Sequence, residues 1–490
     1  GLSLDEDSNL NINALYGIII VKKEEKSDKS IIKIRAILID CSKNICYTYR
    51  QKARGVNRML KRKIYQALVE WKRTKKKECL LVKGARQVGK SFIIERFGKD
   101  NYDSVIVINF YQHPEYKNIF EGDLTPSEIY KRISLQIPGV RFIERKTLLF
   151  LDEIQHCPNA RTAIKFLAQD NRYDVISSGS LLGLHYKDII SVPVGYEKQI
   201  EMYSLDFEEF LWAYGYQSNT IEELKGYFLK KEKIPDFIHE KLSGILREYL
   251  VVGGMPDVVN TFFEENNFQT VYDRQMNILN EYEEDIKKYA KGPERQKIRD
   301  CYYSIPRQLS KEYTKFQYST VAPHGNLRKY EGALDWLKDA GMIKAIYNVS
   351  TPQLPLKAYE KPTEFKIYAT DIGLATAMYG FETQAALVRD SLKGPAKGGI
   401  YENLIFDILT KRGYTLHYIK KEGNMQEIEF LIEQKGTVIP IEVKSKKGET
   451  YSLNAFLKEW NPPYAYKLTA TNIGQVGPKV TMPHYLAMFI

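Results

Sequence analysis

Short apolar runs alternate with helix-like segments in the stretch of chain that follows residue 78. Each run is bounded by polar or turn-forming residues, as buried strands of a sheet are. The runs that we expect to form strands are residues 79–82, 104–110, 147–151 and 174–180. Strands that alternate with helices favour a parallel, doubly wound α/β sheet, which binds ligands at the carboxyl ends of its strands.

A glycine-rich loop follows the first predicted strand. Residues 84–91, GARQVGKS, fit the pattern GxxxxGK[ST] and precede a helix-like segment. Glycines let backbone N–H groups approach a phosphate, and the positive end of the next helix faces the same anion. The alternative is a glycine-rich turn with a solvated lysine. We expect ATP binding by Gly84, Ala85, Arg86, Gln87, Val88, Gly89, Lys90, Ser91 and Phe92.

Hydroxyl, ammonium and carboxylate groups in this region have predicted catalytic roles. Lys90 would reach the β- and γ-phosphates, and Ser91 would ligate Mg²⁺. The strand at 147–151 ends in Asp152, which would hold Mg²⁺ through water, and Glu153, which would activate the attacking water. Ser178, on the next strand, would sense the γ-phosphate. The alternatives are surface acids at 152–153 and an ordinary loop serine at 178.

The pattern becomes helical after this sheet. Residues 203–291 are rich in helix-like segments and would form a lid over the nucleotide. Residues 308–344 then show the order of helices and strand that is typical of a winged helix, a DNA-binding module. Its candidate phosphate contacts are Lys311, Lys315, Arg328 and Lys329. The alternative is a module that only packs domains together.

A second acidic constellation lies near the C-terminus. Glu402 falls in a helix-like segment, Glu429 in a predicted strand, and Glu442 and Lys444 in the partner strand of a hairpin that turns at 434–436. Alternation would place Glu442 and Lys444 on one face of the strand and residues 439, 441 and 443 in the core. Three carboxylates and a lysine make a candidate Mg²⁺-dependent nuclease site, in which the lysine positions the attacking water.

The net charge of +11 is concentrated at the start of the chain. Residues 1–77 contain 19 Lys and Arg against 8 Asp and Glu, and the rest of the chain is balanced. The densest basic stretch, 59–77, suggests either a nucleic-acid contact or, as we favour, a solvated basic helix. Residues 1–58 show no recognisable chemistry, and we hypothesise that the natural start is Met59.

Composition narrows the class of protein further. A chain of 490 residues with 43% hydrophobic and 27% charged residues is expected to hold two to four soluble domains. Its 5 cysteines form no CxxC pair, and no apolar run could span a bilayer. We therefore expect a cytoplasmic protein with reduced thiols and no membrane partner.

The order of these motifs resembles a group of prokaryotic AAA+-type ATPases with a C-terminal domain of unknown function that has a restriction-endonuclease-like fold. The matching segments, within residues 59–447, are GARQVGKS, LLFLDEIQ, ISSGS, MYSLDFEEFLWA, YLVVGGMPDVV, KIYATDIGLA, YEN, EIEFLI and IEVKS. The resemblance implies ATP binding and hydrolysis. Position 429 is Glu where the nuclease pattern has Asp, and the segment after 180 lacks the arginine of many relatives, leaving Arg161 and Arg172 as candidate arginine fingers.

The expected domains follow from these segments. They are an N-terminal extension (1–58), a basic helix (59–78), the P-loop core (79–202), a helical lid (203–295), a winged helix (296–350) and a restriction-endonuclease-like α/β domain (351–490). Three hypotheses on function stay open. The chain is an ATP-dependent switch acting on its nuclease-like domain and on DNA, an ATP-regulated DNA nuclease, or an ATP-dependent scaffold for a partner protein. Self-association is compatible with each.

Overall fold

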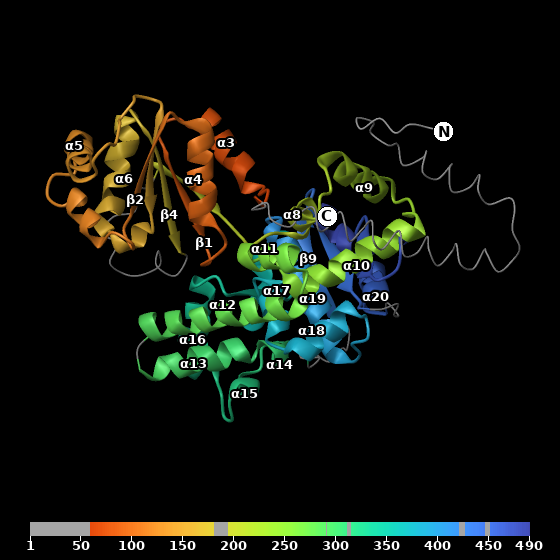
Figure 1. Ribbon diagram of the computed structural model, residues 1–490. Helices are drawn as coiled ribbons and strands as arrows, with labels where there is room; N and C mark the ends of the chain where they lie inside the picture. The colour runs from red at the N-terminus through yellow and green to blue at the C-terminus, as the bar shows by residue number, and fades with distance from the viewer. Residues whose placement is uncertain (1–58, 181–194, 291, 311–314, 421–426, 446–450) are drawn as a thin grey trace, which may run out of the picture. The chain divides into compact units, whose positions relative to one another are not determined.

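The computed structural model describes residues 59–180, 195–290, 292–310, 315–420, 427–445 and 451–490 (Figure 1). The expectations for residues 1–58, including the Met59 start, and for Lys311 lie outside these ranges. Residues Met59–Ile490 cluster into one compact unit. The helices in the described part are each too short or too polar to cross a membrane.

A parallel sheet carries the predicted phosphate loop. In the described ranges its order is β2-β3-β4-β1-β5, and every neighbouring pair is parallel. The strands are β1 (Cys79–Gly84), β2 (Ser104–Asn109), β3 (Thr147–Asp152), β4 (Asp174–Ser180) and β5 (Glu197–Glu201). The α/β prediction is therefore confirmed for this sheet. Strand β4 lies between the strand of the phosphate loop and the strand that ends in Asp152.

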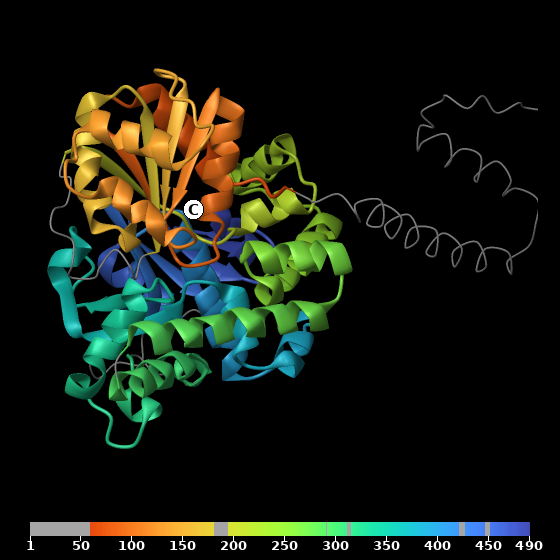
Figure 2. The ribbon, with the colours of Figure 1, turned by 60° about the vertical axis from the view of Figure 1, so that its left-hand side comes forward.

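Helices cover both faces of this sheet (Figures 1 and 2). On one face α3 (Ile64–Thr74) and α4 (Lys90–Asn101) pack their apolar side chains against Leu80, Val82 and Phe150. On the other face α5 (Pro126–Gln136) and α6 (Pro158–Asp170) pack against the alternate residues of the strands. Because both faces are buried, β1 and β3 read as continuous apolar runs rather than as alternating ones.

The sequence pattern gave no prediction of β5. This strand, EKQIE, is at the edge of the sheet and is mostly half-exposed or exposed. An edge strand is held by backbone pairing with one neighbour, here β1, and needs no apolar run to form.

Helices dominate the middle of the chain, as predicted. The first group comprises α8 (Phe207–Ala213), α9 (Ser218–Lys230), α10 (Asp236–Val252), α11 (Pro256–Glu265) and α12 (Phe268–Tyr289). The second comprises α13 (Pro293–Tyr303), α14 (Ile305–Ser310), α15 (Tyr318–Val321) and α16 (Leu327–Asp339). Asp206 begins α8 with a capping box, because its side chain accepts from the Glu209 N–H and the Glu209 side chain accepts from the Asp206 N–H.

A second sheet follows, with the order β12-β13-β11-β10-β9-β8-β6-β7 in the described residues. Its strands are β6 (Ile343–Val349), β7 (Glu360–Ala369), β8 (His417–Lys420), β9 (Glu427–Gln434), β10 (Thr437–Val443), β11 (Ala465–Thr469), β12 (Gly474–Val476) and β13 (Lys479–Pro483). Its helices are α17 (Ile372–Ala377), α18 (Phe381–Val388), α19 (Pro395–Lys411), α20 (Tyr451–Trp460) and a terminal 3₁₀ helix, His484–Phe489. Strand β6, in the segment predicted as a winged helix, is part of this sheet.

The predicted hairpin at 427–444 forms, with β9 and β10 antiparallel. Its two-residue turn has positive φ at Lys435 (50°) and Gly436 (74°), the backbone that matches the twist of paired strands. Ile439, Ile441 and Val443 are buried as expected, and Glu442 on the opposite face is buried too, so both faces of β10 are covered. The reason is that α20 and neighbouring strands build a second apolar cluster, which includes Val438, Leu453 and Phe456.

Candidate functional site

The loop between β1 and α4 has the backbone that its sequence requires. Gly89 has φ 92°, and a Cβ on Gly84 would lie 2.2 Å from the carbonyl oxygen of Met202. A side chain at either position is therefore strained or blocked. Gln87 also has a positive φ, 64°, which a non-glycine residue adopts at some cost.

The Lys90 ammonium lies inside the loop. Its Nζ donates to the carbonyl oxygens of Gly84 (3.1 Å) and Ala85 (2.9 Å), and the side chain is buried. Burial lowers the pKa of Lys90, although Glu153 and Asp152 favour the charged form. Carbonyl oxygens are weaker partners for a cation than phosphate oxygens. The lysine is thus placed where a phosphate would be its better partner.

Neutral donors surround the Asp152 carboxylate at the end of β3. Ser91 Oγ donates to it over 2.9 and 3.0 Å, Asn109 Nδ2 over 2.8 Å, and the Ser178 hydroxyl also donates to it. Burial raises the pKa of Asp152, and the bonds from Ser178 and Ser91 act in the opposite direction. The structure therefore brings together Lys90 and Ser91 of α4, Asp152 of β3 and Ser178 of β4.

Glu153 begins the short helical turn after β3 with a left-handed backbone, φ 54° and ψ 48°. Its N–H donates to Ser178 Oγ over 3.3 Å, and its carboxylate accepts a hydrogen bond from the Gln155 amide. The same amide lies 3.4 Å from Ser180 Oγ at the end of β4. Ser178 is fully buried and contacts Asp152 and Glu153, so its direct partners here are the two acids.

Two side chains of the phosphate loop contact the long helix α12. Arg86 forms an ion pair with Asp285, and the Gln87 amide donates to Glu281. Phe92, the last residue of the predicted nucleotide contact, is 61% exposed. The loop residues therefore divide into glycines and Lys90, which shape the anion cradle, and side chains that contact other parts of the chain.

Neither candidate arginine finger is free in this structure. Arg161 is buried and its guanidinium forms a bidentate pair with Glu197 on β5. Arg172 pairs with Asp170 over 2.9 Å. The pair disfavours Arg161 as a group that reaches out to a nucleotide, because Glu197 would then lose its cation and keep only the Gln199 amide at 3.3 Å.

The basic stretch at 59–77 makes contacts within the chain. Arg62 donates to Val88 O (2.9 Å), Tyr203 O (2.5 Å) and Glu209 Oε2 (3.1 Å), with only 7% of its side chain exposed. Lys63 pairs with Asp206 and Glu208, each over 2.6 Å. Arg62 and Lys63 precede α3 and are paired within the chain, so they do not belong to the solvated basic helix that we expected, and they leave fewer cations for nucleic acid.

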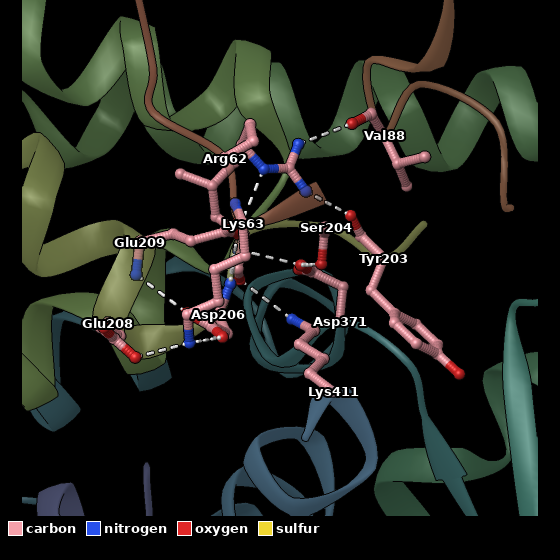
Figure 3. Close-up of polar contacts among 12 residues, drawn as sticks. Arg62, Lys63, Val88, Tyr203, Ser204, Asp206, Glu208, Glu209, Asp371 and Lys411 are labelled. Atoms are coloured by element: carbon pink, nitrogen blue, oxygen red, sulfur yellow. Dashed lines mark hydrogen bonds and ion pairs between the residues drawn. The ribbon is translucent and has the colours of Figure 1, made fainter. Parts of the chain in front are cut away.

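These contacts continue into a polar cluster between distant segments (Figure 3). Ser204 Oγ donates to Asp371 Oδ2 over 2.7 Å, and the Gly254 N–H donates to the same oxygen over 2.9 Å. Lys411 Nζ, which forms an ion pair with Asp407, donates to the carbonyl oxygen of Leu205 over 3.1 Å. Residues 203–205, which follow β5, are thus joined to the phosphate loop by Arg62 and to the C-terminal segments by Asp371 and Lys411.

The predicted nuclease residues lie near one another. Glu402, Glu429 and Lys444 line a cavity of about 690 Å³, whereas Glu442 is 1% exposed beside it. Lys444 Nζ lies 3.1 Å from Glu429 and 3.5 Å from Glu442. Glu402 is paired with Lys366 over 3.0 Å, and Lys366 also pairs with Glu427.

Lysines therefore neutralise these carboxylates. Burial would lower the pKa of Lys366, but Glu402 and Glu427 raise it. Burial raises the pKa of Glu429 to about 7, against the effect of Lys444. In the part of the chain that the structure describes, no group of three or more His, Cys, Asp or Glu side chains is placed to hold a metal ion.

The sequence interpretation missed three residues that complete these sites. Asn109 ends β2 in register with Asp152, and its polar side chain directly after an apolar strand was the available signal. Lys366 and Arg62 gave no local signal, because their acidic partners are 36 and 147 residues away in the sequence.

Comparison with known families assigns the first part of the molecule. Residues 76–211 match the model of the AAA domain. With the parallel sheet and the loop geometry, this match makes that segment an AAA-type ATPase domain. Residues 243–385 and 397–474 match two domains of unknown function, DUF8612 and DUF4143. No curated protein sequence matches the chain.

Solved structures include distant likenesses. The Walker-type ATPase PABY2304 of Pyrococcus abyssi is 14% identical, with 67% of this chain and 97% of that one covered and a TM-score of 0.38. ORC1 of Aeropyrum pernix, solved in complex with DNA, is 14% identical over 66% of this chain and 92% of that one, with a TM-score of 0.27. AMPPCP-bound DnaA of Aquifex aeolicus is 14% identical over 57% and 88%, with a TM-score of 0.22. At these TM-scores the likenesses define neither the fold of the whole chain nor its function.

Proposed function

We propose that the chain binds and hydrolyses ATP, and that the nucleotide state controls its C-terminal domain. The proposal of ATP binding and hydrolysis rests on the convergence of Lys90, Ser91 and Asp152, with Ser91 Oγ 2.9 Å from the Asp152 carboxylate. Gly84 and Gly89 shape the anion cradle, and Lys90 turns from loop carbonyl oxygens to phosphate. Glu153 accepts a proton from the attacking water, and its bond to Gln155 orients its carboxylate.

The donor set at this site fits Mg²⁺. Ser91 and Asp152 offer a hydroxyl and a carboxylate, the oxygen ligands that this ion takes beside phosphates. When bound, the ion neutralises charge that develops on the phosphates. Ser178 and Asn109 hold the Asp152 carboxylate in place. The partners of Asp152 are neutral, so the carboxylate keeps its charge for a cation.

The proposed control of the C-terminal domain rests on the polar cluster of Figure 3. Arg62 binds the loop at Val88 and the 203–205 segment at Tyr203. Ser204 is next in the chain and bonds to Asp371, directly before α17. A nucleotide that reshapes the loop would therefore shift the segment that contacts the C-terminal domain, which is a change between two packed arrangements.

An ATPase assay tests the proposal. Lys90→Ala and Glu153→Gln should each lower ATP turnover by about 100-fold, and only Glu153→Gln should still bind ATP. Ser204→Ala should leave turnover within about threefold of the unaltered protein and remove ATP-dependent changes in hydrogen exchange at residues 365–375. Unchanged turnover in the first two variants would reject the ATPase, and unchanged exchange in Ser204→Ala would reject the coupling.

For the C-terminal domain we propose a binding role rather than cleavage. The supporting observation is that Lys366 and Lys444 neutralise Glu402, Glu427 and Glu429. DNA and a partner protein are the two candidate targets. ATP turnover measured with single-stranded DNA, with double-stranded DNA and without DNA separates them, because only a DNA-acting switch is stimulated.

A nuclease is the second candidate, favoured by the shared cavity of Glu402, Glu429 and Lys444. It predicts Mg²⁺- or Mn²⁺-dependent cleavage of DNA that Lys444→Ala abolishes. Cleavage that is equal in the Lys444→Ala variant comes from a contaminant. Absence of cleavage across substrates and metals rejects this candidate and leaves the ATPase untouched.

A further inference from the structure

A second cavity lies at the carboxyl ends of three strands of the C-terminal sheet. Strands β10, β11 and β13 are parallel neighbours, and the residues that follow them, Ser445, Ala470 and His484, line the cavity. Open sheets of this kind bind ligands at the carboxyl ends of their parallel strands. The cavity has a volume of about 410 Å³, which falls in the range of small-molecule sites.

One face of α10 forms the opposite wall. The lining residues of this helix are His239, Glu240, Ser243, Leu246 and Arg247, and their spacing places them on a single face. Lys397 and Tyr401 of α19 complete the wall. The cavity is thus lined by segments of both domains of unknown function. None of its lining residues belongs to the phosphate loop, and it adjoins the cavity of Glu402 at Ser445.

Arg247 is the cation without a partner in this cavity. Its side chain is half-buried, its Nε is buried with no hydrogen-bond acceptor, and no ion pair involves it among the described residues. By contrast, Lys397 is paired with Asp390 over 2.5 Å. A partly desolvated guanidinium without an anion is unfavourable, and a bound oxyanion would relieve that cost.

The other polar groups are oriented by the protein. His239 contacts Tyr485 Oη over 2.8 Å and Ala470 O over 3.1 Å, and His484 Nε2 lies 3.0 Å from Lys444 O. Tyr401 packs on the His484 ring at 4.6 Å. Glu240 is exposed, and Asp390 is 54% exposed and paired. Neither acid therefore satisfies Arg247.

We propose that this cavity binds a small molecule that carries a phosphate or carboxylate group, with Arg247 as its principal anion contact. The planar fork of arginine matches both oxyanions in a bidentate manner. The aromatic rings of Tyr401 and His484 would face the body of the ligand. Since His484 bonds to the backbone of Lys444, occupancy of this cavity can act on the neighbouring acidic one.

Ligand binding to the full chain tests the proposal. The experiment uses the Lys90→Ala variant, in which the phosphate loop should no longer bind phosphate, so that any binding reports on other sites. The phosphate probes are pyrophosphate and AMP, and the carboxylate probe is citrate. We expect at least one probe to bind by titration calorimetry. Arg247→Gln should weaken that probe at least tenfold, and Arg247→Lys, which keeps the charge but not the fork, should weaken it less.

The matched control is Arg389→Gln, which removes an exposed arginine of the same region that does not line the cavity. It should bind the probe as the background does. Binding of phosphate probes alone, of citrate alone or of both would support the proposal and identify the oxyanion. No binding by any probe, or equal affinity in Arg247→Gln, would overturn it, and neither result bears on ATP hydrolysis at Lys90.

Discussion

Two clusters of carboxylates in this chain have opposite kinds of partner. Asp152 accepts hydrogen bonds from two hydroxyls and an amide, which carry no charge. Glu402 and Glu429 are each paired with a lysine ammonium. Asp152 ends β3, whereas Glu402 lies on α19 and Glu429 on β9, and both clusters match sequence motifs for metal-dependent chemistry.

The difference between neutral and charged partners decides whether each carboxylate cluster can still bind a metal cation. Neutral donors orient a carboxylate and leave its charge available to a cation, whereas an ammonium ion cancels that charge and competes with any metal. The same residue types therefore favour a magnesium nucleotide at the first cluster and a self-neutralised binding surface at the second. The partners, rather than the acids, distinguish the two sites.

The largest expected effect is on ATP turnover when a charge at the first cluster is removed. Asp152→Asn should lower turnover about 10³-fold, because it removes the carboxylate that is proposed to hold Mg²⁺. Glu402→Gln is the matched change at the second cluster and should leave turnover unaltered. A steady-state ATPase assay checks both. Equal losses of turnover in the two variants would contradict the proposed difference between the two carboxylate clusters.

The second prediction concerns stability. Lys366→Met should reduce the free energy of unfolding by about 3 kcal/mol, because Glu402 would stay largely buried without a cation and Glu427 would keep only Lys420, 4.0 Å away. Denaturant titration monitors this change. Adding Glu402→Gln and Glu427→Gln to the same chain should recover most of the loss. If Lys366→Met alone were neutral, the lysine would not be the group that neutralises this cluster.

A third, smaller effect should follow from loss of a neutral donor. Ser178→Ala removes a bond to Asp152 and the acceptor of the Glu153 N–H. We expect kcat to fall about tenfold with little change in KM, as for groups that orient a metal ligand. Ser177→Ala, on the same strand but bonded to Leu80 O, is the control. A change in KM alone would instead point to a direct contact with the nucleotide.

Asp407 has partners of both kinds, Tyr249 and Lys411, and its expected effect is a change of stability with pH. Burial raises its pKa from 3.8 to about 7. The folded state therefore holds a proton that the unfolded state has released, and stability falls as the pH rises from about 4 to 7, by at most about 1.4 kcal/mol per pH unit. Asp407→Asn should flatten this slope in urea titrations. Asp273→Asn, on an exposed site, should retain it.

Local patterns were sufficient for the AAA-type core. Residues 84–91 and the strand that ends in Asp152 predicted the parallel sheet, and the Lys435–Gly436 turn followed from the alternation on either side. Strand β5 could not be predicted, because an edge strand needs no apolar run. The burial of Glu442 depends on the elements packed around β10, and the pairing of Glu402 depends on Lys366. Both are long-range consequences of packing that no short window contains.

The hydrogen bond from Arg62 to the phosphate loop affects where the boundary of a functional fragment can be placed. The segment recognised as an AAA domain, residues 76–211, starts after Arg62 yet contains Glu209, whose side chain is 6% exposed beneath that arginine. A fragment with those limits would lose the cation that pairs with Glu209 and the hydrogen bond from Arg62 to the Val88 carbonyl oxygen of the phosphate loop. The structural unit that supports the phosphate loop is therefore larger than residues 76–211, which match the AAA domain.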